Sequence, residues 1–149
     1  MKEKETYVYF SDASYSHESN CYSTAFTCSR ESQKEFCNAY VYEGNKLFKR
    51  IQANGSEVMG VIRVLKHMRK NKEKIEKAII HYDNEVIKLL AEKKIKADNK
   101  VYQEFRSLYK KMKNLIEFRK TTNKDIRHKK VDKAAYKVLK DYLGTPKIS

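Results

Sequence analysis

The chain has 149 residues, with 33 Lys and Arg against 19 Asp and Glu, so its formal net charge is +14. With 40% hydrophobic and 35% charged residues, the composition excludes both a disordered tail and a membrane-embedded protein. No apolar stretch approaches the roughly 18 residues of a transmembrane helix, so we expect no membrane partner. A charge surplus of this size favours a polyanionic partner, most simply nucleic acid.

Nearly all of the charge surplus lies in the second part of the chain. Residues 1–87 hold 14 basic and 12 acidic residues, whereas residues 88–149 hold 19 and 7, a net charge of +12. A solvated, lysine-rich helical surface is one explanation of the surplus. The surplus nevertheless exceeds the net charge of about 2–8 that keeps a small domain soluble. We therefore expect this part of the chain to contact the polyanion.

The three cysteines, Cys21, Cys28 and Cys37, lie far apart and include no CxxC pair. An odd number without metal-ligand spacing is typical of free thiols in a reducing compartment, so we expect a cytoplasmic protein. The length, and the lack of a Pro- or Gly-rich linker, predict one domain over residues 1–149 with its core at about 6–143.

The first predicted elements are strands, because the sequence there is rich in β-branched and aromatic residues. We expect strands at residues 6–12 and 23–28. A hairpin is expected where residues 36–42 and 46–52 flank the turn-like sequence Glu43-Gly44-Asn45.

Helical periodicity then takes over. Apolar residues recur at helical spacing from residue 56 to residue 68, and residues 78–82 form a short apolar run that suits a buried strand. Residues 86–93 indicate a helix. A further amphipathic helix follows, with an apolar face of Val101, Phe105, Leu108, Met112 and Leu115. After it we expect a strand at residues 116–119 and a closing helix, whose apolar face comprises Val131, Ala134, Ala135, Val138 and Tyr142. The order β-β-β-α-β-α-α-β-α predicts an α/β fold, a mixed sheet with helices on its faces.

Carboxylates stand at the ends of several of these elements. Asp12 and Asp83 each follow an apolar strand, where a carboxylate costs desolvation energy unless something compensates it. Glu57 and Asp132 stand in the first turns of the long helix and of the last helix. If these element ends meet, the four carboxylates suit hard divalent cations, because Mg²⁺ prefers oxygen ligands.

Each carboxylate also has a purely structural explanation. Asp12 and Asp83 could be turn formers at strand ends, and Glu57 and Asp132 could favour the positive end of a helix dipole. The histidines have no metal-ligand spacing, and His81 alternates with core positions, which favours a structural role. Gly-rich phosphate loops and the G-x-S-x-G nucleophile motif are absent.

Four phrases resemble, in order, those of a type 1 ribonuclease H of the ribonuclease H-like superfamily. They are Phe10-Ser11-Asp12-Ala13-Ser14, Asn54-Gly55-Ser56-Glu57, Ile79-Ile80-His81-Tyr82-Asp83-Asn84 and Lys130-Val131-Asp132-Lys133-Ala134-Ala135. They match the family's D-[GA]-S, N-x-x-E, strand-ending D-[SN] and helix-opening x-[AV]-D-x-x-A patterns. The resemblance implies a mixed five-stranded sheet, with three antiparallel strands and then parallel strands, and helices on both faces.

By this resemblance the chain would be an endoribonuclease that hydrolyses the RNA strand of RNA–DNA hybrids, leaving 5′-phosphate and 3′-hydroxyl ends. Two Mg²⁺ ions, with Mn²⁺ as a substitute, would be held by the catalytic carboxylates Asp12, Glu57, Asp83 and Asp132. Recognition of the RNA 2′-hydroxyls would fall to Asn54. Further substrate contacts would come from Ser14, Asn84, Lys120 and Lys124. We expect a monomer.

Some positions depart from the family pattern or have a second explanation. Asn54 with Glu57 could form a helix cap resembling a capping box. The His that many members carry on a mobile loop has no counterpart at residues 120–124, and His128 stands where the family usually has Asn. No role is therefore assigned to His128. Residues 93–100 match a basic hybrid-binding handle of some members, or are a solvated linker.

Three other functions stay open on the sequence alone. The same fold could serve a DNA nuclease or resolvase. The chain could also be a non-catalytic basic nucleic-acid-binding module, or a scaffold protein that binds ribosomal RNA.

Overall fold

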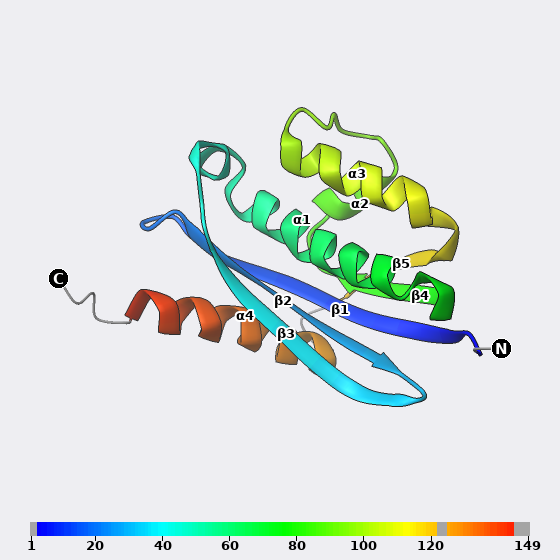
Figure 1. The fold of residues 1–149 in the computed structure, drawn as a ribbon. Helices are drawn as coiled ribbons and strands as arrows, with labels where there is room; N and C mark the ends of the chain where they lie inside the picture. The colour runs from blue at the N-terminus through cyan, green and yellow to red at the C-terminus, as the bar shows by residue number, and fades with distance from the viewer. Residues whose placement is uncertain (1–2, 122–124, 145–149) are drawn as a thin grey trace.

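The chain folds around one mixed five-stranded sheet, whose strands lie in the order β3-β2-β1-β4-β5 (Figure 1). The computed structural model describes residues 3–121 and 125–144. β1 (Glu5–Ser16), β2 (Cys21–Arg30) and β3 (Gln33–Glu43) pair antiparallel. β4 (Ile75–Tyr82) pairs parallel with β1, and β5 (Ile116–Lys120) pairs parallel with β4. The expected sequence of antiparallel and then parallel strands is confirmed.

Helices cover both faces of this sheet. α1 (Lys46–Lys70), α2 (Val86–Ala91) and α3 (Lys100–Met112) lie on one face, and α4 (Ile126–Gly144) lies on the other (Figure 1). Both α1 and α4 contact β2, and every residue of β2 from 21 to 28 is buried. A strand covered on both faces needs no polar alternation, which explains its run of apolar and small polar residues. Among the described residues, no helix is long and apolar enough to span a membrane.

The larger part of the hydrophobic core lies between the sheet and α1, α2 and α3. A smaller cluster lies beneath α4 and consists of Phe10, Ala25, Val131 and Ala135. Two of its four members are alanines, which lets α4 approach the sheet closely. His81 stacks on Phe10 beside this cluster, with ring centroids 4.0 Å apart, and this contact agrees with the structural role predicted for it.

The expected strand at residues 46–52 is wrong, because these residues form the first part of α1. Asn45 caps the helix, its side chain accepting a hydrogen bond from the Phe48 backbone N–H at 3.2 Å. The Phe48 ring stacks on Tyr22, with centroids 4.3 Å apart, and this tertiary contact outweighs the local strand preference. The other predicted elements are present, with bounds that differ by a few residues.

A kink at Gln52 divides α1 into two parts, the second of which matches the helix that the sequence predicts. Gln52 has φ 47° and ψ −128°, a conformation that costs a non-glycine residue on the order of 1–3 kcal/mol. Such strain is commonest close to functional sites. The kink lies two residues before Asn54 and five before Glu57.

α1 packs against β1 most closely at Gly60. A Cβ atom there would lie 3.0 Å from Ser11 Oγ and 3.4 Å from the backbone oxygen of Asp12. A residue without a side chain permits this approach. Glu57 precedes Gly60 by about one turn, so the same approach sets the distance between Glu57 and the strand that carries Asp12.

We expect Gly60→Val to lower the free energy of unfolding by about 1–3 kcal/mol, because the added side chain must push α1 away from β1. Gly144→Val is the matched control, since a Cβ at Gly144 meets nothing within 4 Å. The control should change stability by no more than about 0.5 kcal/mol. Urea unfolding followed by circular dichroism measures both variants. Equal effects would contradict the close approach at Gly60.

Candidate active site

The register of β1 and β4 brings Asp12 and Asp83 together. Phe10 on β1 pairs with His81 on β4 in this parallel pair. Side chains alternate along a strand, so Asp12 and Asp83, two residues further on, lie side by side on the same face as Phe10 and His81. This is the face that α4 covers. Asp12 is buried, with 3% of its surface exposed, and Asp83 is half-buried.

His128 completes this pair of carboxylates from above the sheet. It belongs to the buried stripe of α4 that also contains Val131, Ala135 and Leu139. Its Nε2 atom lies 3.2 Å from Asp83 Oδ2 and 3.6 Å from Asp12 Oδ2. One ligand atom from each of the three residues lies within 4.8 Å of the others, a spacing that suits a bound metal ion.

The other two predicted carboxylates also lie close to Asp12. Glu57, on α1, and Asp132, on α4, both interact with the Asp12 carboxyl group. Glu57 is partly buried and Asp132 is exposed. Asp132 lines a hollow together with Asp83, His128 and Lys129. The fold thus brings all four carboxylates to one place, from two strands and from helices on opposite faces of the sheet.

Burial and crowding raise the pKa of Asp12 and of Glu57. Burial, followed by the negative charge of Asp83, raises the pKa of Asp12 to about 7. Burial and the charges of Asp12 and Asp83 raise the pKa of Glu57 well above its usual value. The hydrogen bond to Asp83 is the largest cause that raises the pKa of His128. Asp12 and Glu57 therefore hold their protons more tightly than free carboxyl groups do, and a bound cation would oppose this effect.

Asn54 and Asn84 form a polar bridge next to the carboxylates. The Asn84 side chain donates from Nδ2 to Asn54 Oδ1 at 3.1 Å, and its own Oδ1 accepts from the Val86 N–H at 2.9 Å. Asn54 therefore links α1 to the turn after β4. The alternative role as the helix cap is wrong, because the non-helical residue at the start of the second part of α1 is Gln52, and Asn54 lies inside the helix.

The other residues predicted to contact the substrate differ in their exposure and in their distance from Asp12. Ser14 is half-buried on β1 and lies on the same face as Asp12, two residues later. Lys120 is exposed at the end of β5, where its Nζ atom pairs with Glu85 at 3.0 Å. Lys124 lies outside the described residues.

The sequence interpretation assigned no role to His128 and did not single out Thr121. The Thr121 hydroxyl lies 3.0 Å from His128 Nδ1 and 3.3 Å from the backbone oxygen of Tyr82. One signal for His128 was available: it precedes Asp132 by four residues on a helix, and this spacing places two side chains on one face. Thr121 had no such signal, because only the tertiary fold brings it to His128.

Several solved structures share the fold of this chain over nearly their whole length. Ribonuclease H1 from the halophilic archaeon Halobacterium salinarum superposes with a TM-score of 0.70, covering 91% of this chain and 98% of that one. The N-terminal ribonuclease H domain of Rv2228c from Mycobacterium tuberculosis also gives 0.70, covering 94% and 97%. The chain has the ribonuclease H fold.

The chain resembles these proteins in structure but has little sequence identity to them. Identity is 8% to the archaeal ribonuclease H1 and 10% to the mycobacterial domain. LC11-RNase H1, solved in complex with an RNA/DNA hybrid, is 13% identical, with a TM-score of 0.65 and coverage of 89% of this chain and 99% of that one. No protein-family model and no curated protein sequence matches the chain.

Without metal ions, raising the pH from about 4 to about 7 should destabilise wild-type protein relative to Asp12→Asn. The pKa of Asp12 is about 7 in the folded protein against a usual 3.8, so the folded state binds more protons in this window and loses stability as they leave. The largest difference this shift allows is about 4 kcal/mol. Urea unfolding in EDTA across this pH range measures it. Parallel stability curves for the two proteins would contradict the shifted pKa.

Proposed function

We propose that the chain is a metal-dependent endoribonuclease that hydrolyses the RNA strand of RNA–DNA hybrids and leaves 5′-phosphate and 3′-hydroxyl ends. One observation carries this proposal: Asp12, within β1, and Asp83, directly after β4, lie side by side, with Glu57 and Asp132 beside Asp12. Both the ribonuclease H fold and the net charge of +14 support a nucleic-acid substrate. A structure with the same fold, LC11-RNase H1, has been solved with an RNA/DNA hybrid.

The residues present fit a hard divalent cation. Asp12, Glu57, Asp83 and Asp132 supply oxygen donors, and the raised pKa values of Asp12 and Glu57 reflect crowding that positive charge would relieve. We propose that these four residues hold two Mg²⁺ ions, for which Mn²⁺ can substitute. Such ions lower the pKa of an attacking water and neutralise charge on the departing 3′-oxygen.

The protein's own groups would orient the site. The Ala13 backbone N–H donates to Asp12 Oδ1 at 2.8 Å, which fixes the Asp12 carboxylate. The Asn54–Asn84 bridge keeps amide groups next to the carboxylates, where an RNA strand would present its 2′-hydroxyls. Ser14 and Lys120 would contact the sugar–phosphate backbone. These contacts read sugar and phosphate, so we expect weak sequence preference.

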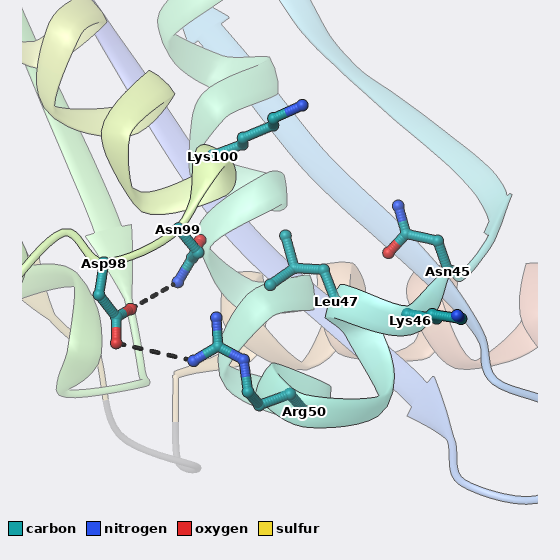
Figure 2. A pocket seen from close by; sticks show the side chains of 7 residues that line it. All are labelled: Asn45, Lys46, Leu47, Arg50, Asp98, Asn99 and Lys100. Carbon is teal, nitrogen blue, oxygen red and sulfur yellow. Dashed lines mark hydrogen bonds and ion pairs between the residues drawn. The ribbon is translucent and has the colours of Figure 1, made fainter.

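A basic hollow between the first residues of α1 and α3 supports binding to phosphate groups (Figure 2). Lys46, Arg50 and Lys100 line it, together with the two helix caps Asn45 and Asn99. Helix N-termini carry positive partial charge, which adds to the three cations. Arg50 is paired with Asp98 at 3.6 Å, but both side chains are 58% exposed, so the pair is weak and can yield to phosphate.

A cleavage assay on a labelled RNA–DNA hybrid tests the proposed activity. We expect Mg²⁺-dependent cutting of the RNA strand, and Asp12→Asn or Asp83→Asn should reduce its rate on the order of a thousandfold or more while binding is kept. Glu73→Gln is the matched control, because Glu73 is exposed just before β4, at the opposite end of that strand from Asp83.

Several results would contradict this assignment. Survival of the hybrid RNA in both Mg²⁺ and Mn²⁺ would show that the protein lacks the proposed nuclease activity. Equal cutting by wild-type protein and the Asp variants would show that the active site lies elsewhere. Preferential cutting of duplex DNA would indicate a DNA nuclease or resolvase instead. The monomeric state and the cytoplasmic location stay predictions.

Arg50→Gln should weaken hybrid binding and make it less sensitive to salt, because each lost phosphate contact reduces the slope of log K against log salt by about 1. Arg69→Gln removes the same charge from the exposed last turn of α1, away from the hollow, and serves as the control. Fluorescence anisotropy with a labelled hybrid over a salt series measures both. If both variants change the slope equally, the hollow has no special part in binding.

A further inference from the structure

His128 has a position that a purely structural residue does not need. Its side chain is 4% exposed and lies against two carboxylates at once, Asp12 and Asp83. Apolar residues fill the other buried positions of the same helix face: Val131, Ala135 and Leu139. A polar ring at this position is costly unless its nitrogen atoms have partners.

The hydrogen bonds around His128 determine which nitrogen faces the carboxylates. The Thr121 hydroxyl donates to the backbone oxygen of Tyr82 at 3.3 Å, so its oxygen is free to accept from His128 Nδ1–H at 3.0 Å. The Thr121 backbone N–H also donates to the Tyr82 oxygen at 2.7 Å, which holds the hydroxyl in place. With Nδ1 as a donor, Nε2 is the nitrogen that faces Asp12 and Asp83. It donates to Asp83 Oδ2 when the imidazole is protonated, and it offers a lone pair to a cation when the imidazole is neutral.

This arrangement is the one that metal-binding histidines adopt. Such histidines donate their other ring N–H to a fixed acceptor, which sets the tautomer and the ring orientation. Two ligand atoms about 2.1 Å from one ion and at right angles to each other are about 3 Å apart. His128 Nε2 lies 3.2 Å from Asp83 Oδ2 and 3.6 Å from Asp12 Oδ2, close to that separation.

We propose that His128 Nε2 is a metal ligand together with Asp12 and Asp83, and that it makes the site prefer Mn²⁺ to Mg²⁺. The inference rests on the proposed function, since it concerns the same metal-dependent site. Imidazole suits transition metals, whereas Mg²⁺ is best bound by oxygen donors. Thr121 acts as a positioning residue through its hydrogen bond to Nδ1.

Electron spin echo spectroscopy of Mn²⁺ bound to the untagged protein tests the proposal without any substrate. Nitrogen directly bound to Mn²⁺ modulates the echo, and labelling the histidines with ¹⁵N changes that modulation. We expect nitrogen modulation in the wild-type protein and its loss in His128→Asn. His17→Asn is the control, since His17 is exposed at the turn between β1 and β2.

Calorimetry supplies a second readout through the ratio of the Kd for Mg²⁺ to the Kd for Mn²⁺. Removing the imidazole ligand should lower this ratio on the order of tenfold, an effect in the range seen for groups that support metal ligands. Thr121→Val should weaken Mn²⁺ binding and keep the nitrogen modulation. Circular dichroism checks that the variants fold. If His128→Asn does not fold, the electron spin echo spectrum of the wild-type protein still tests the proposal.

The failure of this proposal and the failure of the proposed function give different results. Mn²⁺ that binds without nitrogen modulation, in a manner sensitive to Asp83→Asn, overturns the role of His128 and leaves the carboxylate site intact. A wild-type protein that does not bind Mn²⁺, or binds it equally well after Asp83→Asn, overturns both.

Discussion

The placement of Asp12 next to Asp83 is electrostatically costly, and the rest of the site is arranged around this pair of carboxylates. The parallel register of β1 and β4 puts the two carboxylates side by side, and burial removes the water that would screen them. Burial, followed by the charge of Asp83, raises the pKa of Asp12. Natural proteins keep such costly arrangements mainly at functional sites, where a ligand supplies the missing charge.

Other parts of the fold hold this cluster together. Gly60 lets α1 approach β1 and bring Glu57 to Asp12, while small residues beneath α4 let that helix bring His128 and Asp132 down from the other face. The basic residues have a different distribution from the one the sequence suggests. The segment with a net charge of +12 includes α3 and α4, which lie on opposite faces of the sheet (Figure 1). The surplus charge is therefore divided between the two faces, and phosphate binding is better ascribed to local features such as the hollow at Arg50.

Much of this could be predicted from the sequence because periodicity and strand ends are local signals. Asp12 and Asp83 each end an apolar run, so their special positions were visible without a structure. The strand prediction for residues 46–52 was wrong because the helix there depends on the Asn45 cap and on the packing of Phe48 against Tyr22, which is distant in sequence. His128 was missed for a similar reason: its partners come from β1, β4 and the residue after β5, and no single stretch of sequence contains them.

The central claim is that divalent cations bind between Asp12, within β1, and Asp83, directly after β4, where they neutralise the carboxylates. The most direct test is a crystal structure grown with Mn²⁺ and an RNA–DNA hybrid, with the ions located by their anomalous scattering. The account predicts anomalous peaks in contact with the carboxylates of Asp12 and Asp83, beneath a phosphate of the RNA strand. Peaks elsewhere, with Asp12 and Asp83 free of metal and the hybrid bound at another surface, would contradict it.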